Sequence, residues 1–240
     1  MRRLFAVAIT GSLCLVSCRS KSNLDQQLFE ATRKGDLVEV QRLLKNGANP
    51  NANNGDKEFN FTVLETSTSH PNVLKALLAA GADPHLRDSS GGSPLYLAAG
   101  ESAESLRLLL DAGVKPDEPT AEGNTALSFA CQTGNVECIN LLLAKGANVN
   151  HQDSVGFTPL HWTLLSTWTG GATRLQSIRI LLQHQADPRI KDGHGRTALD
   201  WAMMDTLKRK PDADAIIKIL KSAPRVPKAD PTRSPVKSSA

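Results

Sequence analysis

The stretch TPLHWTL, residues 158–164, carries the pattern that decides the fold of this chain. Related stretches recur along the sequence: FTVLETS from Phe61, SPLYLAA from Ser93, TALSFAC from Thr125 and TALDWAM from Thr197. Each sets a Thr or Ser just before a short apolar run, where the hydroxyl group can cap the unpaired backbone N–H groups of a helix. The sequence therefore predicts a short helix at each of these five places.

A second helix is predicted between consecutive copies of the first. Its apolar residues recur at spacings of three and four, as in VEVQRLLKNG, NVLKALLAAG and VECINLLLAKG, with a last copy AIIKILKSA from Ala215. Nearly identical turns follow these helices: GANPN from Gly47, GADPH from Gly81, GVKPD from Gly113, GANVN from Gly146 and QADPR from Gln185. The turns recur at steps of 34, 32, 33 and 39 residues, so one two-helix unit is copied along the chain.

These residues resemble the ankyrin repeat family, and Thr158-Pro-Leu-His161 is a verbatim copy of that family's most diagnostic tetrapeptide. The resemblance implies an all-α solenoid of about six helix-turn-helix repeats, in which His161 is structural rather than catalytic. The two end copies depart from the pattern, as expected of caps against solvent. The expected repeat domain is 24–222, with copies at about 24–53, 54–87, 88–119, 120–152, 153–191 and 192–222.

The N-terminus has the pattern of an export signal. A basic start, Met1-Arg2-Arg3, precedes an apolar run that is too short to span a bilayer. The following Leu15-Val-Ser-Cys18 resembles a bacterial lipobox, which implies a signal peptide over 1–17, lipidation of Cys18 and a tether over 18–23. An ordinary secretory signal is the alternative. The expected location is the bacterial cell envelope, on the periplasmic side of the outer membrane, or otherwise the periplasm or the medium.

Charge and composition limit the partners. Removal of residues 1–17 takes only Arg2 and Arg3 from the 28 basic residues and leaves 26 against 24 acidic ones. This near balance argues against a nucleic-acid-binding surface. The Pro-rich, basic segment 223–240 is predicted to be a disordered tail; the alternatives are a polyproline II ligand or a contact with anionic lipid or cell wall.

No catalytic or metal-binding pattern stands out in the sequence. The six histidines are scattered without ligand spacing, and no nucleophile elbow, phosphate loop or dinucleotide fingerprint occurs. We expect no cofactor, no metal and no small-molecule substrate. Cys131 and Cys138 are expected in the core, facing each other across a tight turn, either as a disulfide or as two small buried hydrophobic residues.

The family resemblance places candidate binding residues at the turn tips and on the exposed side of the first helices, which together line a concave groove. By register these are Glu58, Phe59, Phe61, Ser90, Glu101, Glu122, Asn124, Gln132, Val155, Phe157, Trp168, His194 and Arg196. Phe61 contacts a partner or tucks under copy two, and Phe157 is expected to favour the partner. Trp168 lies in an insertion over Leu165–Arg174, predicted to be a flexible loop, where it contacts a partner or covers Trp162 and Trp201.

Together these features predict an exported, membrane-tethered scaffold that binds another envelope protein in an accessory, inhibitory or recruiting role. A passive structural spacer in the envelope is one alternative. An enzyme with a site at the copy-five insertion is the other, but the sequence offers no paired acid, base or nucleophile for it.

Overall fold

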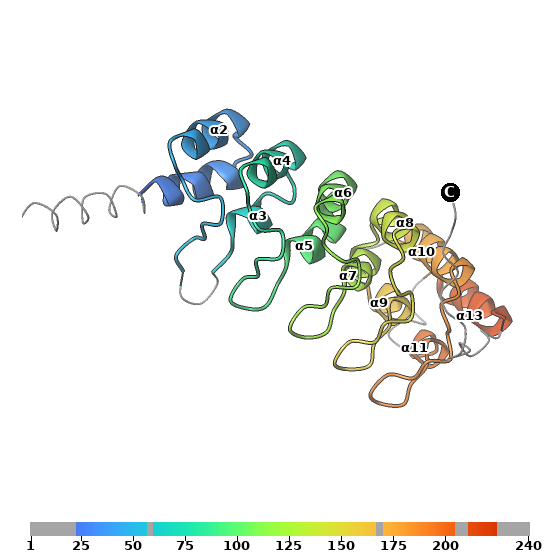
Figure 1. Cartoon of the computed structure of the whole chain (residues 1–240). Helices are drawn as coiled ribbons and strands as arrows, with labels where there is room; N and C mark the ends of the chain where they lie inside the picture. Colours follow the sequence, from blue (N-terminus) through green and yellow to red (C-terminus); the bar gives the residue numbers. More distant parts are fainter. Residues whose placement is uncertain (1–22, 57–59, 167–169, 205–210, 225–240) are drawn as a thin grey trace, which may run out of the picture.

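A computed structural model describes residues 23–56, 60–166, 170–204 and 211–224 of the 240-residue chain. The described part begins in a helix over residues 23–33, which belongs to the inner layer of the stack (Figure 1). The other inner helices are α3 (Val63–Thr66), α5 (Pro94–Glu101), α7 (Ala126–Thr133), α9 (Pro159–Leu165) and α11 (Ala198–Ala202). The outer helices are α2 (Leu37–Lys45), α4 (Pro71–Ala79), α6 (Ala103–Asp111), α8 (Val136–Ala144), α10 (Gly171–Gln183) and α13 (Ala213–Ser222).

Neighbouring helices within each layer contact one another in chain order. In the inner layer α3, α5, α7, α9 and α11 pack in succession, and in the outer layer α2, α4, α6, α8, α10 and α13 do the same. A single apolar core, rich in leucine, runs continuously between the two layers. The predicted all-α ankyrin-type solenoid is therefore confirmed; one isolated antiparallel bridge, Asn53 to Thr62, interrupts the otherwise helical pattern of the described residues.

The inner helices begin where the sequence predicted, because the hydroxyl residues act as caps. In copy five, His161 Nδ1 accepts hydrogen bonds from the N–H of Thr158 (3.2 Å) and from its hydroxyl (2.8 Å). The pairs Thr125–Ser128 and Thr197–Asp200 close the same reciprocal capping box. His161 is only 1% exposed and serves the helix start, as expected of a structural residue.

The outer helices are followed by residues in the left-handed conformation. Gly47, Gly81, Gly113 and Gly146 have φ angles of 87° to 100°, which glycine adopts without steric cost. Gln185 occupies the equivalent place after α10 with φ 68°, and it is the one non-glycine residue with positive φ in the described part of the chain. The turn of copy five thus has the same conformation as the others, but the positive φ of Gln185 makes it less favourable.

Replacing Gln185 by glycine is expected to raise the free energy of unfolding by about 1 kcal/mol, because the left-handed strain on a side-chain-bearing residue disappears. The backbone carbonyl of residue 185, which accepts from Asn150 Nδ2 at 3.0 Å, is unaffected by this change. Urea denaturation of the parent and the variant measures the difference. A variant that is less stable than the parent would contradict the expectation.

Long loops join each outer helix to the next inner helix and project side by side from one edge of the stack (Figure 1). Side-chain oxygens tie each loop to its successor. Asn51 Oδ1 accepts from the N–H of Asp83 at 2.7 Å, and Asn150 Oδ1 accepts from the N–H of Asp187 at 2.8 Å. The repeated polar residue at the end of the turn motif therefore holds the loops in register.

Both core cysteines are free thiols, so the disulfide considered from the sequence is not formed. The two side chains contact different neighbouring copies, one on each side of copy four. The Cys138 thiol lies 3.9 Å from the carbonyl oxygen of Ala98 in copy three, whereas Cys131 contacts the Thr163 side chain of copy five. Burial raises the pKa of each thiol to about 12, which keeps both protonated and unreactive.

The insertion in copy five differs from the prediction. The segment Leu165–Arg174 was expected to be a flexible loop, but Gly171–Arg174 form the first turn of α10, which has 13 residues where α8 has nine. The prediction was wrong there because Arg174 has a buried ionic partner: its Nη1 lies 2.6 Å from Asp212 Oδ2, just before α13. Trp168 lies outside the described residues.

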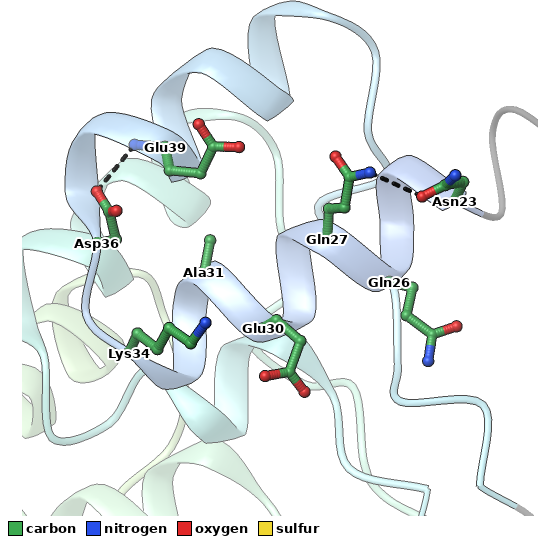
Figure 2. Close-up of a pocket in the computed structure, with 8 residues that line it drawn as sticks. All are labelled: Asn23, Gln26, Gln27, Glu30, Ala31, Lys34, Asp36 and Glu39. Atoms are coloured by element: carbon green, nitrogen blue, oxygen red, sulfur yellow. Dashed lines mark hydrogen bonds between the residues drawn. The ribbon is translucent and has the colours of Figure 1, made fainter.

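The first copy presents a polar surface to solvent at the open end of the stack. A hollow of about 320 Å³ is lined mainly by polar side chains of the 23–33 helix and the start of α2, and Figure 2 shows these residues. Asp36 Oδ1 caps α2 by accepting from the N–H of Glu39 at 3.1 Å. Such a surface is what a capping repeat requires. The expected signal peptide, tether and almost all of the tail lie outside the described residues.

Candidate functional site

Four of the predicted binding residues converge on one hollow of about 250 Å³ among copies two, three and four. They are Phe61, Ser90, Glu122 and Asn124, and they come from three successive loops. The remaining lining residues are Asp88, Gly92, Tyr96, Leu97 and Thr120. The sequence register therefore identified nearly half of the lining of this hollow, which we call the groove hollow.

The loop of copy three is held rigidly at this place. Asp88 Oδ1 accepts from the N–H of Ser90 (2.8 Å), from the Ser90 hydroxyl (2.7 Å) and from the N–H of Gly92 (2.7 Å). Gly91 has φ 78°, and a Cβ added there would lie 2.6 Å from the Cβ of Ala121 in the next loop. The two loops thus approach so closely at Gly91 that only glycine fits there.

An aromatic pair underlies the groove hollow. Tyr96 of α5 stacks on Phe129 of α7 with ring centroids 4.5 Å apart and an interplanar angle of 20°. Phe61, from the preceding loop, is 37% exposed and lines the same hollow. Aromatic rings that remain accessible beside polar groups are the usual anchors of protein interfaces.

The charged residues that line the groove hollow, Asp88 and Glu122, are both acidic. Burial, together with the carboxylates of Glu122 and Asp153, raises the pKa of Tyr96 to about 12. The nearby Arg87 does not offset these charges, because its guanidinium group is engaged by Glu118 Oε1 at 2.9 Å and by the Gly91 carbonyl at 3.0 Å.

The predicted candidates in copies five and six do not join the groove hollow. Val155 is 49% exposed at its tip, and its carbonyl accepts from the N–H of Gly193 at 2.8 Å. His194 is exposed, whereas Arg196 lies over the Trp201 ring, with its guanidinium carbon 5.1 Å from the ring centroid.

Phe157, one of the predicted tip residues, packs against aromatic neighbours in the stack. Its half-buried ring stacks on His161 and meets Trp162 and Trp201 edge to face, with centroid distances of 5.5 to 5.7 Å. The ring therefore packs between copies five and six. The cause is the pair of tryptophans at equivalent places in the two copies.

Two further candidates have structural partners. Glu101 is exposed at the end of α5, and its Oε2 accepts from the Thr68 hydroxyl at 2.6 Å. Gln132 is half-buried, and its backbone carbonyl accepts a hydrogen bond from the Ser166 hydroxyl at 2.5 Å. Glu58, Phe59 and the lipidation candidate Cys18 lie outside the described residues.

Sequence reasoning missed Asp88 and Tyr96 in the lining of the groove hollow. Asp88 was not among the predicted tip residues, but it is one of the residues that line the hollow. Tyr96 stands at the register position of His161, where the family pattern predicts a capping residue. A tyrosine there leaves the helix cap to Ser93, whose hydroxyl accepts from the Tyr96 N–H at 3.2 Å, and contributes an aromatic ring to the hollow.

Other features of the described residues give less support for a functional site. The hollow in Figure 2 lies on the end cap, where Glu30 pairs with Arg33 at 2.9 Å and Glu39 pairs with Arg42. Within the described ranges no group of three His, Cys, Asp or Glu residues is arranged to hold a metal ion. No helix in this part of the chain combines the length and apolarity needed to cross a membrane.

Known proteins share this architecture. A family model for ankyrin repeats in three copies matches residues 28–120, 63–153 and 98–192. The ankyrin repeat protein YahD of Escherichia coli (strain K12) is 30% identical over 187 residues, which cover 76% of this chain and 91% of that protein. The mitochondrial disaggregases of Homo sapiens and Bos taurus are 32% and 33% identical, over 78% and 62% of this chain. The chain spans only about a quarter of each disaggregase, 26% and 23%. With its paired helices, capped starts and matching turns, this chain belongs to the ankyrin repeat family.

Proposed function

We propose that this chain is an exported, lipid-anchored scaffold that binds another envelope protein through the groove face of its repeats. The single observation that carries the binding role is the convergence of Phe61, Ser90, Glu122 and Asn124 on one hollow. Residues in an ankyrin stack are repeated for packing, but these four are not dictated by the core. An accessible hollow with aromatic and polar lining is suited to a protein partner.

Export and anchoring rest on the N-terminal sequence. The basic start, the apolar run and Leu15-Val-Ser-Cys18 together have the form of a lipoprotein signal. Two or more acyl chains at Cys18 would hold the protein stably on a membrane. Only about six residues separate Cys18 from the repeats, at most about 20 Å of extended chain, so the partner must lie at or come to the membrane surface.

Replacing Cys18 by serine is expected to move the protein from the membrane fraction to the soluble fraction, because the acyl chains have no other attachment point. The parent should partition into the detergent phase on cloud-point extraction, and the variant should stay in the aqueous phase. Cys14→Ser, a matched change inside the signal, should leave the parent behaviour unaltered. Membrane retention of the Cys18→Ser protein would contradict lipid anchoring.

Partner binding is tested by capture from native membranes with the full-length protein. In the variant Phe61→Ala/Glu122→Ala, one aromatic ring and one carboxylate are removed from the groove hollow. The matched control is Val38→Ala/Glu137→Ala, which removes one exposed apolar side chain and one exposed carboxylate from outer helices α2 and α8.

The parent and the control are expected to recover the same envelope protein, and the groove variant at least about ten-fold less of it, as for an interface anchored by a few residues. Circular dichroism must show that all three proteins are folded. Equal recovery of the partner by the groove variant would indicate that the partner binds elsewhere on the chain. Failure of the parent to recover any protein would favour the passive spacer.

A further inference from the structure

One aspartate organises the tip loop in three of the copies. In Asp88, Asp153 and Asp192, Oδ1 accepts from the N–H groups two and four residues later, at 2.7 to 3.0 Å. In copies five and six the second oxygen is also engaged. Trp162 Nε1 donates to Asp153 Oδ2 at 2.9 Å, and Trp201 Nε1 donates to Asp192 Oδ2 at 2.8 Å.

Copy three has the aspartate without the tryptophan. The position nine residues after Asp88 is Leu97, which has no hydrogen to donate. Among the described residues no hydrogen bond reaches Asp88 Oδ2. Asp88 is one of the residues that line the groove hollow, and the oxygen equivalent to its Oδ2 accepts a tryptophan N–H in the other two copies.

Two more acceptors lie in the same lining. Asn124 Oδ1 is buried and accepts no hydrogen bond within the described part of the chain. Glu122 is exposed, and its Oε2 receives only the long contact from Asn124 Nδ2 at 3.3 Å. The lining of the groove hollow therefore includes two carboxylates and one amide oxygen, together with the Tyr96 and Phe61 side chains.

We propose that the groove hollow binds a basic side chain of the partner protein, with arginine as the best fit. This inference rests on the proposed binding role and specifies its chemistry. Lysine and arginine are the side chains that only donate hydrogen bonds, so they match the carboxylates of Asp88 and Glu122 in this lining. The arginine guanidinium is planar, forms charge-assisted pairs with carboxylates and stacks on aromatic rings.

Charge complementarity distinguishes this occupant from others. An acidic segment would meet Asp88 and Glu122 with like charge, and the nearby cation Arg87 is paired with Glu118. A purely apolar segment would bury the open acceptors without satisfying them, which is unfavourable. A basic side chain satisfies the acceptors and uses the ring faces together.

The test uses the full-length, ¹⁵N-labelled protein in detergent micelles, titrated with N-acetyl-arginine amide, N-acetyl-lysine amide and N-acetyl-citrulline amide. Citrulline matches arginine in shape but is neutral. The expected result is saturable shifts of the amide signals of residues 88–92 and 120–124, strongest with arginine, weaker with lysine, and at least about ten-fold weaker with citrulline. Raising the salt concentration from 50 to 500 mM should weaken arginine binding.

Variants localise the effect. Asp88→Asn keeps the turn acceptor but removes the charge, and Glu122→Gln removes the other charge; each is expected to weaken arginine binding about three-fold, in the range of partly exposed ion pairs. Glu137→Gln on α8 should bind as the parent does. Equal binding of citrulline, shifts confined to other residues, or unchanged binding by both groove variants would overturn the proposal.

The two levels of inference fail separately. The amide titration needs no partner, so it can succeed when membrane capture finds none, which would count against the scaffold role alone. Conversely, a partner that is captured equally well by the parent and by Asp88→Asn/Glu122→Gln would preserve the scaffold and overturn the basic-side-chain inference.

Discussion

Replacing Asp212 by alanine is expected to lower the free energy of unfolding by about 3–5 kcal/mol, because it removes one partner of a buried ion pair. Arg174 and Asp212 are 3% and 6% exposed and lie 2.6 Å apart. Arg174 also donates to the Ser166 carbonyl at 3.1 Å. The pair joins α10 of copy five to α13 of the last copy, so the C-terminal repeat should unfold first, at a lower urea concentration.

Two control variants separate charge loss from packing. Asp111→Ala breaks an exposed pair with Lys145, which is 2.9 Å long and also joins neighbouring copies, and should cost less than about 1 kcal/mol. Arg174→Met/Asp212→Leu removes both charges and should recover much of the stability lost in Asp212→Ala, since apolar replacements of buried pairs are tolerated. Equal, small effects of Asp212→Ala and Asp111→Ala would show that the buried pair is not structurally important.

Replacing Glu65 by glutamine is expected to stabilise the protein at alkaline pH and to have little effect under acid conditions. Glu65 is 2% exposed, and its Oε1 accepts no hydrogen bond among the described residues. Burial, reinforced by the Asp88 carboxylate, raises the pKa of Glu65 from 4.5 to about 7, although hydrogen bonds from Thr62 oppose the shift.

The sign of the pH effect follows from the raised pKa in the folded state. The folded chain holds the Glu65 proton more tightly than the unfolded chain, so this contribution to stability is complete below about pH 4.5 and is lost as the pH rises through 7. The two pKa values correspond to about 3 kcal/mol. Glutamine should recover about that amount at pH 8.5, as it keeps the capping interaction with Thr62.

Urea denaturation of the parent and Glu65→Gln at pH 4.5 and pH 8.5 measures this difference. Glu104→Gln, in the exposed first turn of α6, is the matched control and should change stability by less than about 0.5 kcal/mol at both pH values. Parallel stability profiles for the parent and Glu65→Gln across this pH range would show that Glu65 is not the responsible group.

The regular part of the fold could be predicted because it depends on local chemistry that each copy repeats. Thr158 and His161 cap α9 through hydrogen bonds only three residues apart, and Gly146 ends α8 through its own backbone angle. Such signals are visible in any window of the sequence. They fixed the helix order, the period and the placement of Phe61, Ser90, Glu122 and Asn124 on adjacent loops.

Features that depend on a specific neighbour could not be predicted in the same way. The register marks Phe157 as a free tip residue, but its ring is held by Trp162 and by Trp201 of the next copy. Arg174 and Asp212 lie 38 residues apart in the sequence. Arg174 belongs to an insertion that has no equivalent in the other copies, so the repeat pattern does not predict this ion pair. The oxygen Asp88 Oδ2 is recognised as lacking a tryptophan donor only when its loop is compared with the loops of Asp153 and Asp192.

Hydrogen–deuterium exchange on the captured complex, read residue by residue against the free protein, would locate the binding face. The expected result is protection of the loops over residues 80–93 and 112–125 and of the first turns of α5 and α7, with exchange unchanged in outer helices α4, α6 and α8. Protection confined to those outer helices or to the segment after residue 224 would contradict a groove-binding scaffold.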